Sequence, residues 1–329
     1  MRQTLNALLA AVAIMGVCAN CNHAGADSYP SRPITMVHPY GAGGSGDTLA
    51  RIVAEGMKAS LKQPVIVENL PGAAGRLALA KVSRAAPDGY TVVLGNWGTH
   101  VVGPATQEVP YNVVKDFVPV SLAATQPLVI VANRRVPSND LQGLVAWVKA
   151  NPDEATVGTA GPGSATHLAS LIFQTKTGVR LLVVPYSGGG AQSMNDLIGG
   201  HINLLFTQAS NALPHVNAGK IKAYAVTANA RLTAAPDIPT VDGAGVPGLH
   251  VAVWHAVWAP KGTPKAIVRK LNDAVANVLD NPETQKRLAD IGLELFPKDQ
   301  LSPDALAAFH AAEIERWWPI IKASSIKAE

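Results

Sequence analysis

An apolar run that ends in a glycine-rich loop and leads into a helical pattern occurs four times along this chain. The loops are residues 38–47, 69–75, 160–164 and 185–190. Strands that alternate with helices of this length form βαβ units, which assemble into parallel sheets. The sequence therefore predicts an α/β protein whose glycine loops follow the carboxyl ends of parallel strands, where open sheets of this class bind ligands.

The first part of the chain predicts three strands separated by two helices. The strands are Ile34–His38, Val65–Glu68 and Thr91–Gly95, and the helices are Asp47–Leu61 and about 75–85. After the third strand, residues 95–99 have a polar composition that predicts a loop. Trp97 in this loop and Tyr40 in the first glycine loop are therefore candidates to touch a ligand.

Two apolar runs, Val118–Ala123 and Leu128–Val131, predict a crossing into a second domain. There the pattern of strand, loop and helix recurs, and a strongly apolar strand at Val251–Ala259 carries the chain back. Trp254 and Trp258 on that strand are expected in the core or hinge. The predicted domains are residues 27–125 together with 250–329, and residues 126–249. The helices expected in the second domain and at the end of the chain are Leu141–Ala150, Ala165–Thr177, a helix ending at Ile198, Lys265–Leu279, Pro282–Ile291 and Pro303–Lys322. The strands expected there are Ala155–Thr159, Arg180–Val184, Ile202–Phe206 and Ile221–Thr227.

Residues 1–26 resemble a secretory signal peptide. Arg2 is followed by an apolar stretch, and Ala24-Gly25-Ala26 supplies a small-x-small cleavage site. An uncleaved anchor is the alternative, and a lipoprotein interpretation through either cysteine lacks the usual residues before it. Because both cysteines lie in this segment, the mature chain has none and must be stable from its core alone.

Charge and composition exclude a nucleic-acid partner. The precursor carries a net charge of +4, and removal of Arg2 with the signal peptide leaves +3. The basic residues are dispersed, and no basic run interleaves with aromatic residues. The sequence thus predicts an exported protein with no nucleic-acid surface.

The first glycine loop is expected to hold an anion, since N–H groups at a helix N-terminus bind anions readily. Its spacing Gly41-x-Gly43-x-x-Gly46, with Glu68 about 20 residues on, also fits a dinucleotide fingerprint. A dinucleotide-dependent oxidoreductase is therefore the alternative interpretation. Against it, Asp47 would cap the N–H groups that a pyrophosphate needs, export limits access to nicotinamide cofactors, and the loops of the second domain stay unexplained.

The sequence has no motif for catalysis or for a bound cofactor. Ser45 and Ser164 lack the Gly-x-Ser-x-Gly elbow, and the histidines form no HExxH pair. The mature chain has no thiolate, so a metal site has no support. We therefore predict a protein that is not an enzyme and has no cofactor. His167, on a helix just after a glycine loop, either donates to a ligand or only caps and packs.

Many sequence blocks along the chain match one family. The blocks PYGAGGSGD, ENLPGAAG, PDGYTVVLG, KDFVPV, GPGSATHLA, VPYSGGG, AGKIKAYAVT, IPTVDGAGVPG and WAPKGTP occur in order. Together they resemble the Bug family, the periplasmic solute-binding proteins of tripartite tricarboxylate transporters, over nearly all of residues 29–322. The resemblance implies a two-domain Venus-flytrap fold in which each domain is a sheet flanked by helices.

The resemblance also implies a function. A Bug protein in the periplasm binds a small carboxylate, here of the dicarboxylate or aromatic acid class, by a pincer of two loops. It then delivers the ligand to membrane permease subunits or to a periplasmic sensor, and we expect a monomer. On this chain one loop would contribute Tyr40, Ala42, Gly43, Gly44 and Asp47, and the other Gly161, Gly163, Ser164 and His167. Asn96, Tyr186 and Thr207 are the further ligand-binding residues expected.

The chain departs from the family pattern after the strand Ile202–Phe206. Many relatives carry an aspartate there that faces the pocket, whereas this chain reads Thr207-Gln208. A neutral residue removes a partner for a ligand ammonium group, so we hypothesise that an amino acid is disfavoured as ligand. Arg51, in the first helix, is expected to pair with a nearby acid on the surface, and the role of Arg76 is open.

Overall fold

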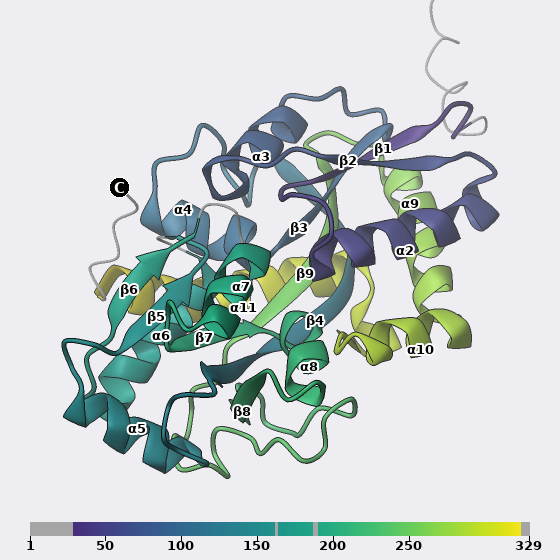
Figure 1. Ribbon diagram of the computed structural model, residues 1–329. Helices are drawn as coiled ribbons and strands as arrows, with labels where there is room; N and C mark the ends of the chain where they lie inside the picture. The colour runs from purple at the N-terminus through teal and green to yellow at the C-terminus, as the bar shows by residue number, and fades with distance from the viewer. Residues whose placement is uncertain (1–28, 162–163, 187–189, 324–329) are drawn as a thin grey trace, which may run out of the picture.

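The computed structural model describes residues 29–161, 164–186 and 190–323. The predicted signal peptide therefore lies outside the described residues. Within them, strands form one mixed sheet in the order β2-β1-β3-β9-β4-β7-β5-β6, with β8 and β10 also pairing with β4 (Figure 1). Helices flank this sheet, as the alternating sequence pattern predicts.

The bounds of the strands are β1 (Ile34–His38), β2 (Val65–Asn69), β3 (Thr91–Asn96), β4 (Phe117–Asn133), β5 (Thr156–Thr159), β6 (Leu182–Pro185), β7 (Leu204–Gln208), β8 (Ile221–Val226), β9 (Ala252–Pro260) and β10 (Glu294–Leu295). The helices are α2 (Ser45–Leu61), α3 (Arg76–Ser83), α4 (Gly103–Thr106), α5 (Leu141–Ala150), α6 (Ala165–Thr177), α7 (Gly190–Gly199), α8 (Ala209–Asn217), α9 (Lys265–Leu279), α10 (Pro282–Asp290) and α11 (Pro303–Ala323). Three short helical turns are η2 (Ala73–Gly75), η3 (Gly98–Val102) and η4 (Lys298–Gln300).

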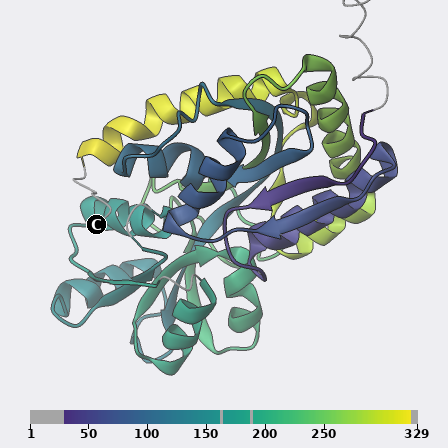
Figure 2. The same cartoon turned by 90° about the horizontal axis from the view of Figure 1, so that it is seen from above.

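The long strand β4 joins the two halves of the sheet. Its first part pairs with β9 and its last part with β7 and β8. The sequence predicted two apolar runs here, and the structure makes them one continuous strand. Most of its residues are buried because helices α7, α8, α9 and α11 contact it, which explains the nearly unbroken apolar sequence. In Figure 2, α11 runs along one edge of the molecule.

The sheet contains two sets of parallel strands, β1 to β3 and β5 to β7. The carboxyl ends of these two sets point toward each other. β3 runs in the same direction as β4, since both are antiparallel to β9, whereas β7 and its parallel neighbour β5 run the opposite way. Through β9, the last residue of β3, Asn96, lies level with Ala124 of β4, and the last residue of β7, Gln208, pairs with Leu128. Those two β4 residues are about 13 Å apart along the strand, at about 3.3 Å per residue. The loops that follow both strand sets therefore converge on the middle of β4.

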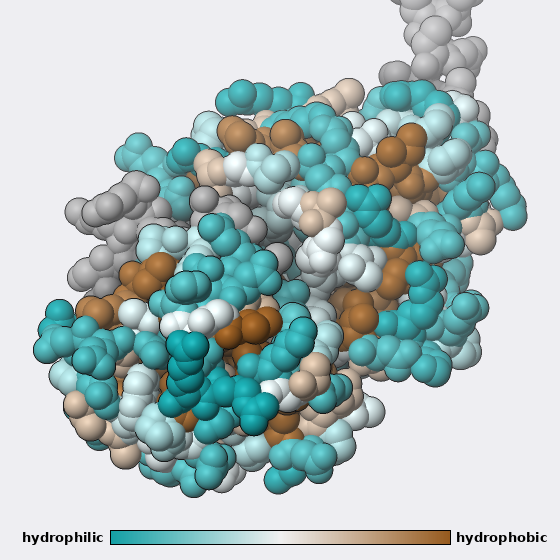
Figure 3. Space-filling view, in the orientation of Figure 1, coloured by the Kyte–Doolittle hydropathy of each residue, from teal (hydrophilic) through white to brown (hydrophobic). Residues whose placement is uncertain are grey.

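The surface is mostly polar. On the face shown in Figure 3, apolar residues form small separate groups among hydrophilic ones. Among the described residues, no helix has the length and apolar character needed to cross a membrane. In the part of the chain that the structure describes, the large hydrophobic side chains that are exposed are Ile66, Leu77, Val114, Val183 and Ile320.

Candidate ligand-binding site

Residues 39–47, which we call the first arm, connect β1 to α2. They leave a strand of one parallel set at its carboxyl end, and Figure 1 shows the N-terminal end of α2 turned toward the middle of the molecule. Gly44 caps α2 without a side-chain hydrogen bond, and the first helical bond runs from Thr48 N to Gly44 O. The N–H groups of the first turn before Thr48 therefore have no acceptor within the helix.

Asp47 organises the first arm through its carboxylate. Oδ2 accepts the Gly43 N–H at 2.9 Å and the Arg51 Nε at 3.0 Å, and Oδ1 accepts the Asn69 Nδ2 at 2.8 Å. Burial acts to raise the pKa of the Asp47 carboxyl, but these hydrogen bonds outweigh it and leave the pKa below its ordinary value. Asp47 is thus a buried, ionised acceptor that holds the turn at Gly43.

The glycines of the first arm leave its backbone uncovered. A Cβ atom built on Gly41, Gly43 or Gly44 would meet no described atom within 4 Å. Gly43 has a φ of +90°, in the left-handed region where a glycine is favoured. The backbone of this loop is therefore open to a ligand.

Gly46 serves a different purpose. A Cβ atom there would lie 2.8 Å from His38 Nε2 and 3.2 Å from His255 Cε1. Both histidines are buried, so the side-chain-free position lets α2 approach them closely. The third glycine of the apparent dinucleotide fingerprint is thus explained by packing. Asp47, moreover, occupies the Gly43 N–H as the sequence predicted.

Residues 160–167, the second arm, connect β5 to α6. Ser164 is the N-cap of α6, and its Oγ accepts the His167 N–H at 3.2 Å. The Thr166 Oγ1 accepts the Ala160 N–H at 2.9 Å, which closes the loop onto the helix. Gly161 has a φ of +93°, and a Cβ there would meet nothing within 4 Å. Gly163 lies outside the described residues.

The His167 side chain is half-buried in the first turn of α6. Burial lowers the pKa of its imidazole below the ordinary value, so the ring is neutral at pH 7 and carries one N–H donor. A neutral imidazole can donate to a carboxylate without adding a charge to the second arm.

Tyr40 and Asn96 lie together between the first arm and the end of β3. The Tyr40 hydroxyl donates to Asn96 Oδ1 at 3.3 Å, and the Thr99 N–H donates to the same oxygen at 3.0 Å. Burial raises the pKa of the Tyr40 phenol to about 12, so it is a neutral donor. These contacts bring two of the predicted residues together.

Tyr186 and Thr207 are both buried and belong to the other half of the sheet. The Tyr186 hydroxyl donates to Asp196 Oδ2 at 2.7 Å, and burial followed by the Asp196 carboxylate raises the pKa of the phenol to about 12. Thr207 pairs with Val129 in the middle of the sheet, one residue before the end of β7. Both are placed near the converging strand ends.

Trp97 is not where the sequence predicted it. Residues after Asn96 form a helical turn that continues into η3, and the loop expected at 95–99 is wrong. The Trp97 ring is fully buried and packs edge-on against Trp317 with centroids 5.1 Å apart. It is a core residue. Trp254 and Trp258 are also buried on β9, which confirms their expected place in the core.

Two residues next to the first arm complete it. Arg51 pairs with an acid as expected, but that acid, Asp47, is buried and belongs to the arm itself. Asn69, the last residue of β2, was not predicted as a site residue, although its amide contacts the arm at several points. The block ENLPGAAG carried the only sequence signal for it.

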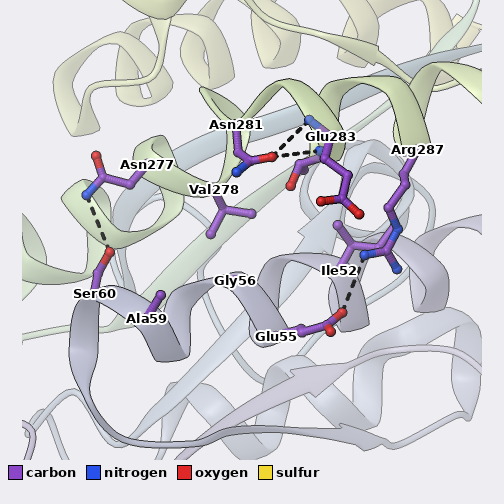
Figure 4. Close-up of a pocket in the computed structure, with 11 residues that line it drawn as sticks. Ile52, Glu55, Gly56, Ala59, Ser60, Asn277, Val278, Asn281, Glu283 and Arg287 are labelled. Carbon is purple, nitrogen blue, oxygen red and sulfur yellow. Dashed lines mark hydrogen bonds and ion pairs between the residues drawn. The ribbon is translucent and has the colours of Figure 1, made fainter.

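A separate pocket of about 320 Å³ lies between α2, α9 and α10 (Figure 4). The Glu55–Arg287 ion pair at 3.5 Å and the Asn277–Ser60 hydrogen bond at 3.4 Å span it. Gly56 packs against Val278 at its floor, where a Cβ would come within 2.5 Å. None of the predicted site residues that the structure describes lines this pocket, which is the groove left by helix packing.

The fold, in which loops from two sets of parallel strands converge, is shared with solved periplasmic binding proteins. The sequence model of the protein family described as "Tripartite tricarboxylate transporter family receptor" matches residues 49–326 of this chain. The chain therefore belongs to this family of solute-binding proteins, which includes the Bug proteins. BugT of Bordetella pertussis is 34% identical over 96% of this chain and 95% of its own length. A protein encoded in the TAR-I ttuE–ttuC′ intergenic region of Agrobacterium vitis is 40% identical over 90% of this chain and 85% of its own.

Solved structures agree with this assignment. The periplasmic binding protein BugD is 37% identical with a TM-score of 0.84, covering 92% of this chain and 100% of that one. MatC from Rhodopseudomonas palustris, with bound malate, is 37% identical with a TM-score of 0.83, covering 89% and 100%. A second R. palustris protein, with adipate, is 32% identical with a TM-score of 0.85, covering 91% and 99%. These relatives give the oxidoreductase alternative no support.

Proposed function

We propose that this solute-binding protein captures a small dicarboxylate or aromatic acid between the first and second arms. Its domains would be residues 27–125 with 250–329, and residues 126–249, and they would close on the ligand. The open backbone at Gly41, Gly43, Gly44 and Gly161, at the N-termini of two helices whose strands converge, is the observation that supports this most. The malate and adipate in two neighbouring structures support the acid class.

The charge of the site favours an acid whose binding relies on N–H donors. Helix N-termini carry a partial positive potential, and α2 and α6 have 17 and 13 residues. Tyr40, Asn96, Ser164 and His167 would supply neutral polar groups, and Tyr186 and Thr207 would line the second domain. Because Thr207 is uncharged, we expect plain carboxylates to be preferred over amino acids.

The role in the cell follows from the family. We infer that the protein is exported, that its signal peptide is cleaved near Ala26, and that it acts in the periplasm as a monomer. It would deliver the acid to membrane permease subunits or to a periplasmic sensor without catalysing a reaction and without a cofactor. Co-purification with the permease subunits after crosslinking would favour delivery for transport.

A thermal-shift screen of residues 27–329 tests the ligand class. The panel is malate, adipate, citrate, benzoate, nicotinamide, aspartate, glutamate and NAD, since a ligand that binds the native state raises the melting temperature. We expect a shift with a dicarboxylate or an aromatic acid. A shift with NAD alone would overturn the proposal, and a shift with aspartate or glutamate but no plain acid would contradict the inference from Thr207.

Two matched glycine variants locate the site. Gly161 in the second arm and Gly178 at the opposite end of α6 both have positive φ, +93° and +65°, and both have open space where a Cβ would lie. Gly161→Ala and Gly178→Ala should therefore cost similar stability, about 1 kcal/mol each. Only Gly161→Ala should weaken acid binding in isothermal titration. Equal affinities for the two variants would exclude the second arm from the site.

A further inference from the structure

Asn69 stands outside the first arm yet contacts it at several points. It is the last residue of β2 and pairs in register with His38, the last residue of β1. Its side-chain nitrogen donates to Asp47 Oδ1 at 2.8 Å and to the Tyr40 carbonyl at 3.0 Å. Its side-chain oxygen accepts the Arg51 Nη2 at 2.9 Å. One amide thus joins a strand end, the loop and the helix.

The orientation of this amide is fixed by its neighbours. A carboxylate and a carbonyl can only accept, and a guanidinium can only donate, so the nitrogen must face Asp47 and Tyr40 and the oxygen must face Arg51. The two amide hydrogens are used by these two acceptors. The His38 Nδ1, which is 3.1 Å from the Tyr40 carbonyl, is therefore left to donate to that carbonyl. In this assignment the Asn69 amide, the Asp47 carboxylate and the Tyr40 carbonyl each have one consistent role, and the 3.3 Å approach of Asn69 Nδ2 to His38 Nδ1 brings two donors together.

The contacts among Asp47, Arg51 and Asn69 also determine the net charge next to a bound anion. Asp47 accepts the Gly43 N–H, so its negative charge lies inside the loop whose open backbone at Gly41 and Gly44 is proposed to receive a carboxylate. Arg51 is half-exposed and balances that charge only while its guanidinium stays on Asp47, and Asn69 holds its Nη2. Loss of the amide would leave the guanidinium held by its Nε hydrogen bond to Asp47 alone, so that the charge of Asp47 is balanced less steadily when an anionic ligand arrives.

We propose that Asn69 is a positioning residue for ligand capture: its amide fixes the open backbone of residues 40–43 and keeps Arg51 paired with Asp47. This inference rests on the proposed function, since it assigns a role within the same site. Asn69 itself contacts the first arm and Arg51, and it acts on the ligand through these contacts.

The test compares three variants of residues 27–329. Asn69→Leu removes the amide with little change in side-chain size, and Asn69→Asp keeps an acceptor for Arg51 but cannot donate to Asp47 or Tyr40. Glu68→Gln, one residue earlier on β2, removes the half-exposed ion pair to Lys81 and serves as the control. The readouts are the dissociation constants of malate and adipate, the melting temperature, and amide hydrogen exchange of residues 38–47 in the ligand-free protein.

Both Asn69 variants should bind the acid at least about tenfold more weakly, while Glu68→Gln binds as the wild type does. Hydrogen exchange at residues 38–47 should rise in Asn69→Leu even where the core strands keep their protection. Wild-type affinity with unchanged exchange in either Asn69 variant would overturn the proposal. Should Asn69→Leu fail to fold, Asn69→Asp alone decides. Should the wild type bind neither malate nor adipate, the dicarboxylate part of the proposed ligand class fails, while the exchange of residues 38–47 still shows whether Asn69 positions the arm.

Discussion

The two arms have the same place in their sheets but are held in shape by different means. The first arm depends on a buried carboxylate, a guanidinium and an amide from the neighbouring strand, so its shape comes from contacts 4 to 29 residues apart. The second arm depends on the hydroxyls of Ser164 and Thr166, which bond to backbone N–H groups no more than six residues away. The first arm is charged and assembled by the fold, whereas the second is neutral and local.

This difference shows where each arm is sensitive. A hydroxyl cap can be replaced by water at modest cost, because both of its partners lie at a helix end. A buried carboxylate that serves three donors has no such substitute, since each donor would be left without its acceptor. We therefore expect the first arm to respond strongly to substitution and acid, and the second arm to respond weakly.

The largest effect is expected from Asp47→Ala. It removes the acceptor of the Gly43 N–H and the partner of Arg51 from a side chain that is 5% exposed. The free energy of unfolding, measured by urea denaturation, should fall by about 3 kcal/mol. Asp47→Asn keeps the shape and one acceptor and should lose less than half as much. A loss below about 1 kcal/mol for Asp47→Ala would contradict the expectation that the first arm is more sensitive to substitution than the second.

The contrast also explains what the sequence could predict. Helices α5, α6 and α9 have the predicted bounds, because each is set by local signals such as the Asp140 and Ser164 caps and an apolar stripe. The second arm was predictable for the same reason, since Ser164 follows a glycine loop and precedes a helix. Strand β1 also has the predicted bounds.

What the sequence missed depends on contacts between distant segments. Helix α8 begins directly after β7 with no side-chain cap and contains Pro214, so it had no local start signal. The burial of Trp97 depends on Trp317, which is 220 residues away on α11. Asn69 gains its role only when β2 pairs with β1. Local sequence patterns therefore predict the structure of the second arm better than that of the first.

Acid is expected to loosen the first arm before the second. His38 and His255 pack against Gly46, and burial lowers the pKa of both, that of His255 to about 3. The unfolded chain, with a histidine pKa of about 6.5, then binds more protons than the folded one. The contribution of the neutral, buried histidines to the free energy of unfolding is therefore complete above about pH 6.5, and it is lost as the pH falls toward 3.

Between pH 7 and pH 5 the loss from His255 alone should be about 2 kcal/mol in the free energy of unfolding. Urea denaturation at both pH values measures it, and His255→Gln should lose about 2 kcal/mol less than the wild type over this range. Hydrogen exchange at residues 39–47 should rise over this pH range in the wild type and rise less in His255→Gln. Equal acid losses in the two proteins would show that His255 does not carry this effect.

The smallest effect is expected from Ser164→Ala in the second arm. The substitution removes the N-cap hydrogen bond to the His167 N–H and the 3.0 Å hydrogen bond between Ser164 Oγ and Thr166 Oγ1, and the free energy of unfolding should fall by about 1 kcal/mol. Asp140→Ala is the matched control, because Asp140 caps α5 through the Gly143 N–H at 2.7 Å and lies on no arm. The two variants should lose similar stability in urea denaturation, but only Ser164→Ala should weaken binding of the acid. A stability loss for Ser164→Ala as large as that for Asp47→Ala would mean that the neutral arm is as tightly coupled to the fold as the charged one.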